Sequence, residues 1–139
     1  MQVTIPPALS PEDRSKLGTA LRADVAAEFG PVDESEIAIL LHDDDSTLQG
    51  GLVGTVLWGW LYIRWLWVEE SHRGMGWGQE LLRRAEEEVH QRGCRGVYID
   101  TFSPRAMALY ERCGYTLWGV LDDFPPGHSR RFLKKEITH

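Results

Sequence analysis

The sequence predicts a mixed α/β domain in which one central sheet carries helices on its faces. Three observations support this fold class: apolar runs of strand length recur along the chain, two segments carry an apolar stripe at helical spacing, and glycine or proline separates most of these segments. The chain has 139 residues, of which 42% are hydrophobic and 26% are charged. We therefore expect one domain over residues 1–139, large enough to bury a core of its own.

The first half of the chain predicts one helix and several strands. Ser10 followed by Pro11 is typical of a helix start, because serine accepts a hydrogen bond from the first turn and proline tolerates the first helical position. This helix is expected to reach about Phe29, ahead of a Gly-Pro pair. Short runs rich in apolar and β-branched residues predict strands at residues 2–5, 36–42, 52–58 and 61–68, the last two forming a hairpin.

The second half predicts two helices that alternate with strands. A helix over residues 78–91 has an apolar stripe and charged pairs four residues apart, and Gly93 follows as its C-terminal cap. Ser103 and Pro104 predict the start of another helix, which Gly114 ends. Strands are expected at residues 97–102, 115–121 and 131–137, and the stripe of the first helix consists of Leu81, Leu82, Ala85 and Val89.

The charge balance excludes some classes of partner. The chain has 15 Lys and Arg against 21 Asp and Glu, a net charge of -6, and most of its basic residues are scattered. A surface that binds nucleic acid or an anionic membrane needs clustered basic residues, so neither partner is expected. A cationic partner suits the acidic balance better.

Cysteine use and the N-terminal residues predict a cytoplasmic protein. Cys94 and Cys113 have no CxxC spacing, so we expect no metal site and no disulfide, but two small buried side chains in a reducing compartment. The first residues lack the basic residue and the long apolar run of a signal peptide. The uncharged stretch at residues 47–63 is interrupted by glycines and is shorter than the roughly 18 residues that a membrane helix needs.

Three alternate glycines lie between the apolar run that ends at Val68 and the following helix, in the order Arg73-Gly74-Met75-Gly76-Trp77-Gly78. Glycines let the backbone approach a ligand closely, and a helix that begins at Gly76 or Trp77 points its positive end into the same space. A phosphate is the expected occupant, and a tight turn without a ligand is the alternative.

Two other kinds of phosphate loop have different spacings. A P-loop is excluded because no Gly-Lys-Ser or Gly-Lys-Thr occurs. The dinucleotide fingerprint GxGxxG is a closer match, and Asp100 ends the next strand where a ribose-binding acid would lie. However, Gln79 stands where the third glycine is required, and residues 69–73 separate the strand from the first glycine. Because the dinucleotide turn follows its strand immediately, we reject this loop type.

Two linked motifs, LWVEESHRGMGWGQELL at residues 66–82 and SPRAMALYERCGY at residues 103–115, resemble the GNAT superfamily of acyl-CoA-dependent N-acetyltransferases. The first is similar to the family's strand, its Arg/Gln-x-x-Gly-x-Gly/Ala pyrophosphate loop and its helix. The second is similar to the family's Asn-x-x-Ala-x-x-Leu-Tyr-Glu-x-x-Gly-Phe/Tyr segment. The resemblance covers residues 50–121 well and the ends of the chain in outline, although DDFPPGHSRRFL resembles the ending of some small bacterial members.

The resemblance implies both a fold and a cofactor. The fold would be GNAT-like, with a mostly antiparallel central sheet of about six or seven strands, splayed at the cofactor site and flanked by about four helices. Acetyl-CoA would be the co-substrate, and its pantetheine arm would pair with the backbone of Leu66, Trp67 and Val68. Ordinary core packing is the alternative for Leu66 and Val68. The pyrophosphate would be held by the amides of Arg73, Gly74, Met75, Gly76, Trp77 and Gly78.

The same resemblance implies roles for individual side chains. Tyr110 would donate a proton to the thiolate that leaves when an amine attacks the thioester, and a core aromatic is the alternative. Ser103 stands where the family often has an asparagine that contacts the cofactor arm, and capping the helix is its other role. Tyr98 occupies the place of the glutamate base of some relatives, so that base cannot be carried over. Glu69, which follows the strand that would carry the thioester, is preferred as base over Glu70, His72, Asp122, Asp123 and His128.

We therefore expect an enzyme that moves an acetyl group from acetyl-CoA to an amine of a small molecule or peptide, by direct attack in a ternary complex. No acetyl-cysteine is expected, because neither cysteine has an evident histidine partner. A non-catalytic acyl-CoA-binding or sensing module and a nucleotide-binding protein are the other classes. Alternation places Trp58 with Trp60, and Trp65 with Trp67, on faces of the hairpin, where one pair lines either an acceptor pocket or a homodimer contact.

Overall fold

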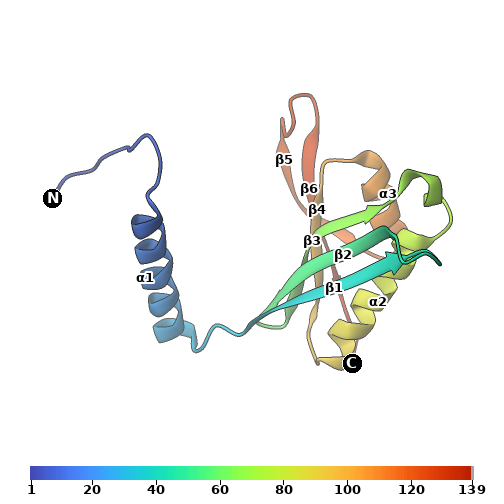
Figure 1. Ribbon diagram of the computed structural model, residues 1–139, viewed down its shortest axis with the longest axis horizontal. Helices are drawn as coiled ribbons and strands as arrows, with labels where there is room; N and C mark the ends of the chain where they lie inside the picture. Colours follow the sequence, from blue (N-terminus) through green and yellow to red (C-terminus); the bar gives the residue numbers. More distant parts are fainter. Residues whose placement is uncertain (139) are drawn as a thin grey trace. The chain divides into compact units, whose positions relative to one another are not determined.

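The computed structural model describes residues 1–138 of the chain (Figure 1). These residues form two units, Met1–Asp33 and the part from Glu34 onward, and each is described by itself. The first unit contains helix α1, Pro11–Phe29, in which the Ser10 hydroxyl accepts a hydrogen bond from the Asp13 amide at 3.1 Å. The predicted helix is confirmed at both ends, and the single domain stays a prediction.

The prediction of a strand at residues 2–5 is wrong. This segment pairs with none of the described strands. A strand is stable only when its backbone groups find partners in a sheet, and an apolar alternation over four residues does not supply them. Pro6 and Pro7, which have no amide hydrogen to donate, follow directly.

The second unit is one six-stranded sheet with helices packed against it. The strand order is β1-β2-β3-β4-β6-β5. The strand count agrees with the expected fold, and the described residues contain three α-helices and one short 3-10 helix where about four helices were expected. The strands are β1 Glu34–His42, β2 Leu48–Leu57, β3 Trp60–Val68, β4 Gly96–Thr101, β5 Thr116–Asp122 and β6 Ser129–Glu136; the helices of this unit are η1 Glu70–His72, α2 Trp77–Gln91 and α3 Pro104–Arg112.

The centre of the sheet opens between β3 and β4. All other neighbouring strands are antiparallel, but β3 and β4 are parallel, and their pairing extends only from Trp60 with Gly96 to Ile63 with Ile99. Beyond this point β3 continues to Val68 without β4 as a partner. The expected splay is therefore confirmed.

A β-bulge and a tight turn shape β3. Val53 of β2 pairs with Trp65 and Gly54 pairs with Ile63, so Arg64 is an extra residue in β3. The turn between β2 and β3 consists of Trp58 and Gly59, whose φ angles of 46° and 82° are both positive, as a two-residue hairpin turn of this hand requires. The first strand of the hairpin therefore ends at Leu57 and not at Trp58, and because Trp58 lies in the turn, strand alternation does not place it on one face with Trp60.

The core lies between the sheet and helix α2. The predicted stripe of α2, Leu81, Leu82, Ala85 and Val89, is buried against apolar side chains of the central strands. Leu82 is fully buried, and its truncation to alanine would cost about 2–5 kcal/mol. Among the described residues, no helix is both long and apolar enough to cross a membrane.

Candidate active site

A cleft of about 560 Å³ lies where the open end of β3 meets the loop before α2 and one side of α3. It brings together residues from both sequence motifs, which residues 83–102 separate along the chain. Nine of the predicted or candidate residues line it: Leu66, Val68, His72, Arg73, Gly74, Gly76, Trp77, Gly78 and Tyr110.

The start of α2 leaves backbone donors for a ligand. Gly76 is the N-cap residue, with φ at 90°, and no side chain caps the helix. The first amides of α2 therefore lack a partner from a capping side chain, and the positive end of the helix faces the glycine loop. A Cβ at Gly74 or Gly76 would meet no atom within 4 Å. Glycine is thus required at these positions by the positive φ and not by lack of space.

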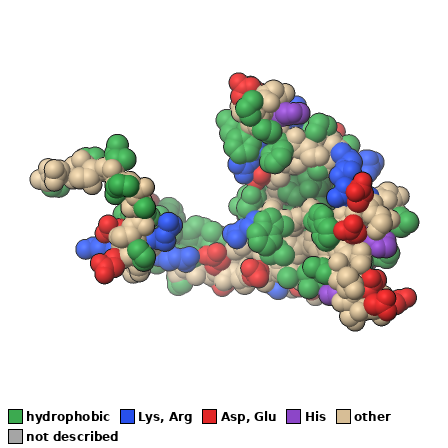
Figure 2. Space-filling model, turned by 45° about the horizontal axis from the view of Figure 1, so that its top comes forward, with side chains coloured by type: hydrophobic (Ala, Val, Ile, Leu, Met, Phe, Trp, Pro, Cys, Tyr) green, Lys and Arg blue, Asp and Glu red, His purple; other side chains and the backbone are tan. Residues whose placement is uncertain are grey.

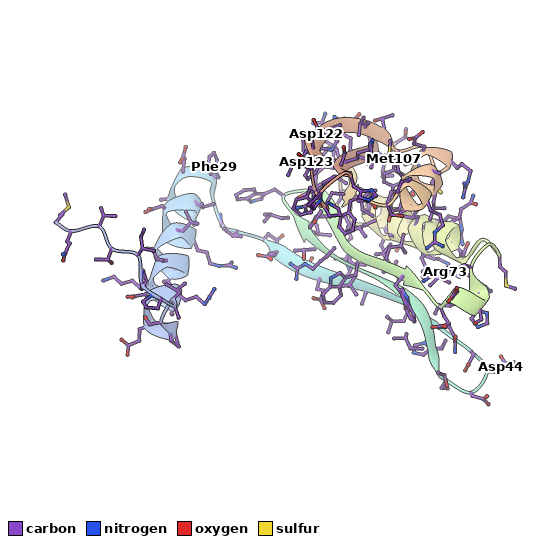
Figure 3. All side chains as sticks on the ribbon, turned by 90° about the horizontal axis from the view of Figure 1, so that it is seen from above. Phe29, Asp44, Arg73, Met107, Asp122 and Asp123 are labelled. Atoms are coloured by element: carbon purple, nitrogen blue, oxygen red, sulfur yellow. The ribbon has the colours of Figure 1, made fainter. Side chains whose placement is uncertain are left out.

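The side chain of Arg73 connects the glycine loop to the end of β3 by a hydrogen bond (Figure 3). Its Nε donates a hydrogen bond to the Val68 carbonyl oxygen at 2.9 Å. This bond closes the turn through η1, so that the strand end and the helix start lie on the same cleft. The side chain of Arg73 thus has a structural partner, while its backbone stays in the glycine loop.

Two predicted residues of this segment point elsewhere. Trp67 and Met75 are exposed and do not line the cleft. Trp67 stands between Leu66 and Val68, which line the cleft, and neighbouring residues of a strand point to opposite faces. A contact of Trp67 with a cofactor would therefore use the backbone, as predicted, and the predicted contact of Met75 is through its loop amide.

Tyr110 reaches the cleft from α3 and is buried. Its ring centroid lies 6.2 Å from that of Tyr115. Burial raises the pKa of the Tyr110 phenol to about 12, and the negative charge of Asp100 and the Cys113 thiol add to this shift. The phenol is therefore protonated at neutral pH and able to donate a hydrogen bond into the cleft. Tyr110 is both a core residue and a cleft residue, so its two predicted roles are compatible.

Ser103 and Glu69 do not line the cleft. The Ser103 hydroxyl accepts a hydrogen bond from the Ala106 amide at 3.2 Å, which confirms its capping role. Glu69 precedes η1, and its amide donates to the Gln49 carbonyl oxygen at 2.7 Å. A contact of Ser103 with the cofactor and the function of Glu69 as base stay predictions.

The remaining candidate bases lie in several places. Glu70 and His72 belong to η1, and His72 lines the cleft. Asp122 and Asp123 lie at the end of β5 (Figure 3). Their oxygens accept bonds from the Ser129 hydroxyl and the Gly127 amide, so both contribute to the turn between β5 and β6, which also contains His128.

Sequence reasoning missed two arginines of the cleft. Arg105 and Arg112 of α3 line it together with Arg73. They are seven residues apart, which is close to two helical turns and places them on the same side of α3. This spacing was visible in the sequence, but the apolar face of α3 was the feature interpreted. Three arginines therefore line the cleft, and a positive charge of this kind suits a polyphosphate.

Comparisons with known proteins agree with this geometry. Residues 9–115 match the model of the Acetyltransferase (GNAT) family. The chain is 45% identical to Acetyltransferase Atu2258 of Agrobacterium fabrum over 80% of its length and 81% of the relative's. It is 36% identical to Blasticidin-S acetyltransferase of Streptomyces morookaense over 91% of its length and 92% of the relative's.

A solved structure shows the same fold. The crystal structure of a proposed acetyltransferase from Agrobacterium tumefaciens has a TM-score of 0.90, with 39% identity, over 98% of this chain and 99% of that one. The family match covers both sequence motifs and the residues that bring them to the cleft. The chain belongs to the GNAT family and is an acetyltransferase.

Proposed function

We propose that this enzyme transfers an acetyl group from acetyl-CoA to an amine of a small molecule, by direct attack in a ternary complex. One observation carries the proposal: a single cleft joins an uncapped helix start, the unpaired end of a strand and a buried, protonated tyrosine. These are a phosphate site, a site for an extended amide chain and a proton donor. A peptide amine is the broader alternative acceptor.

The cofactor would lie along the cleft from α2 to the opening of the sheet. Its pyrophosphate would accept hydrogen bonds from the amides between Arg73 and Gly78, with the guanidinium groups of Arg105 and Arg112 nearby. The pantetheine arm would pair with the backbone of residues 66–68, where β3 has no partner on the side of β4. The thioester would then lie where β3 and β4 separate.

Tyr110 would move the proton that the reaction displaces. The amine nitrogen bonds to the thioester carbon, the carbon–sulfur bond breaks, and a proton must pass from nitrogen to sulfur. A thiol has a pKa of about 8.5, so a phenol of pKa about 12 does not give up its proton to a thiolate alone. The protons balance when Tyr110 gives its proton to the sulfur atom and receives the proton that the nitrogen loses. We keep Glu69 as the proposed base for the incoming ammonium.

The relatives support a small amine as acceptor. The Streptomyces morookaense relative is named for the acetylation of blasticidin S, and its match extends over nearly the whole chain. Blasticidin S is therefore the first acceptor to test. The non-catalytic sensing module is the competing proposal, and it differs in predicting binding of acetyl-CoA without turnover.

The test combines binding with turnover. Acetyl-CoA should raise the melting temperature of the protein, while NAD and ATP should leave it unchanged. Release of free thiol in the presence of blasticidin S or of a panel of amines should then show transfer. Absence of a thermal shift with every CoA ester would refute the proposal, and a shift without thiol release for any amine would favour the sensing module.

A further inference from the structure

A group of polar and aromatic side chains lies where β3 and β4 separate, outside the cleft that we propose for the cofactor. Tyr62 stands between Leu61 and Ile63, and Tyr98 stands between Val97 and Ile99, and all four neighbours are buried in the core with α2. Because residues of a strand alternate between faces, both tyrosines and Asp100 lie on the face opposite α2. Hydrophobic side chains gather at the β5–β6 end of this unit (Figure 2).

Asp100 is at the centre of this group. Its Oδ2 accepts a hydrogen bond from the Tyr62 hydroxyl at 2.6 Å. Its Oδ1 accepts a hydrogen bond from Nε of Arg130 at 2.9 Å and lies 2.8 Å from Nη2 of the same side chain in an ion pair. The lone pairs of the carboxylate are thus largely occupied, so Asp100 is a partner that holds other groups and not a free receptor for an amine.

Arg130 also lies against two aromatic rings. Its guanidinium carbon lies 5.0 Å from the ring centroid of Phe124 and 5.2 Å from that of Phe132. Asp100 and these two rings come from β4, β6 and the loop after β5, so three segments determine one guanidinium orientation. The side chain of Arg130 is 30% exposed, against 14% for Asp100. Arg130 is therefore the more exposed residue of the ion pair.

The exposed donors of Arg130 form a site for an anion. A guanidinium has five N–H donors, and Nε and Nη2 meet Asp100. The Tyr62 side chain is a further hydrogen-bond partner of Arg130, so the donors left at the exposed end of the guanidinium are the ones that can meet a carboxylate. For a partly buried ion pair the loss of hydration offsets much of the attraction, so positioning explains the arrangement better than stabilisation does.

The position of the group connects it with the reaction centre. Ile63 and Ile99 form the last pair between β3 and β4, so Arg64 and Asp100 are the first residues beyond the join. The charge of Asp100 also contributes to the raised pKa of the Tyr110 phenol. Tyr110 thus approaches the opening from the helix side of the sheet and the Asp100–Arg130 pair approaches it from the other side. Beside the pair, the rings of Tyr62 and Tyr98 are stacked at 4.9 Å.

We propose that Arg130 is a specificity residue that binds a carboxylate of the acceptor, while the Tyr62–Tyr98 stack carries a planar part of the same molecule. The acceptor class is then a planar amine that bears a carboxylate, with its amine directed at the opening between β3 and β4. This inference rests on the proposed transferase function and adds the chemical class of the acceptor to it.

The experiment compares two probes that differ in one charge. Binding of 4-(aminomethyl)benzoate and of 4-(aminomethyl)benzamide to the CoA-saturated protein is measured by titration calorimetry. We expect the benzoate to bind at least tenfold more tightly, because its carboxylate pairs with the exposed donors of Arg130. Arg130→Gln should abolish this preference. Equal binding of the two probes, or no measurable binding of either, would overturn the inference.

Matched variants distinguish a loss of probe binding from a folding defect. Lys134→Gln removes a positive charge from the same strand and face, about 13 Å along β6 from Arg130, and should keep the preference. Asp100→Asn combined with Arg130→Gln leaves no unpaired charge and should lose the preference as the single variant does. A preference that survives in either Arg130 variant would refute the proposal. The thermal shift with acetyl-CoA reports on the proposed function separately: its absence in the unmodified protein would refute the transferase, whereas a shift together with equal binding of the two probes would refute the acceptor proposal alone.

Discussion

The cofactor cleft and the Arg130 group lie on opposite faces of the same opening, and they are built differently. One wall of the cleft comes from a continuous segment, residues 66–78, which acts mainly through glycine φ angles and backbone amides. The Arg130 group joins β3, β4, β6 and the loop after β5, and it acts through side chains. The two proposals thus assign the fixed co-substrate to backbone geometry and the variable acceptor to side chains, which mutation can exchange.

Tyr110 is the exception on the cofactor side, because its side chain does the proposed chemistry. Tyr110→Phe should lower kcat by about 100-fold or more, the usual contribution of a general acid, and should change the Kd of acetyl-CoA by less than about twofold. Tyr115→Phe is the matched control, since Tyr115 is also buried but bonds to Glu86 at 3.1 Å. It should lower Tm and leave kcat unchanged. Equal loss of binding and turnover in Tyr110→Phe would make Tyr110 structural.

Gly76→Ala tests whether backbone geometry holds the cofactor. Alanine at a φ of 90° is strained by about 1–2 kcal/mol, and the displaced amides should raise the Kd of acetyl-CoA by about tenfold. Gly93→Ala introduces comparable strain just beyond the other end of α2, where φ is 67° and a Cβ would also meet open space. Both variants should lose similar Tm, and calorimetry should find weaker acetyl-CoA binding in Gly76→Ala alone. Parallel weakening in both would mean that general destabilisation is the cause.

Ser103→Ala distinguishes a fold contact from a cofactor contact. The hydroxyl caps α3, so its loss should lower the free energy of unfolding by about 1 kcal/mol. The Kd of acetyl-CoA should stay the same, because Ser103 does not line the cleft. Chemical denaturation and titration of the same preparations measure both quantities. A severalfold rise in Kd at nearly unchanged stability would assign Ser103 to the cofactor site.

The smallest effect is expected from alkaline pH, where Asp100 joins the two regions electrostatically. The pKa of Tyr110 is raised from about 10 to about 12, so its contribution to stability is complete below pH 10 and is lost as pH rises towards 12. Between pH 7 and 10, kcat should show no fall due to ionisation of Tyr110. Ultraviolet titration of the protein and of Tyr110→Phe measures the phenolate directly. A difference between them that titrates near pH 10 would contradict the raised pKa.

The same contrast explains what the sequence could predict. The glycine loop and the motif around Tyr110 are local patterns, so the cleft could be predicted together with α2, α3 and the splay. The Asp100 contacts could not, because Tyr62 is 38 residues and Arg130 is 30 residues away along the chain. Their meeting depends on β6 inserting between β4 and β5 in the sheet. Arg105 and Arg112 were missed for another reason, since the periodicity of α3 was interpreted only through its apolar residues.

The bulge at Arg64 changes which residues of β3 point towards the helices. Before it, odd-numbered Leu61 and Ile63 face the helices; after it, even-numbered Leu66 lies opposite the buried Leu52. Without the extra residue, Trp65 and Trp67 would take the inward positions. Their indoles would then fill the space that runs beside Tyr110. A single inserted residue therefore determines whether this strand presents a smooth aliphatic channel to the cofactor or blocks it with two aromatic rings.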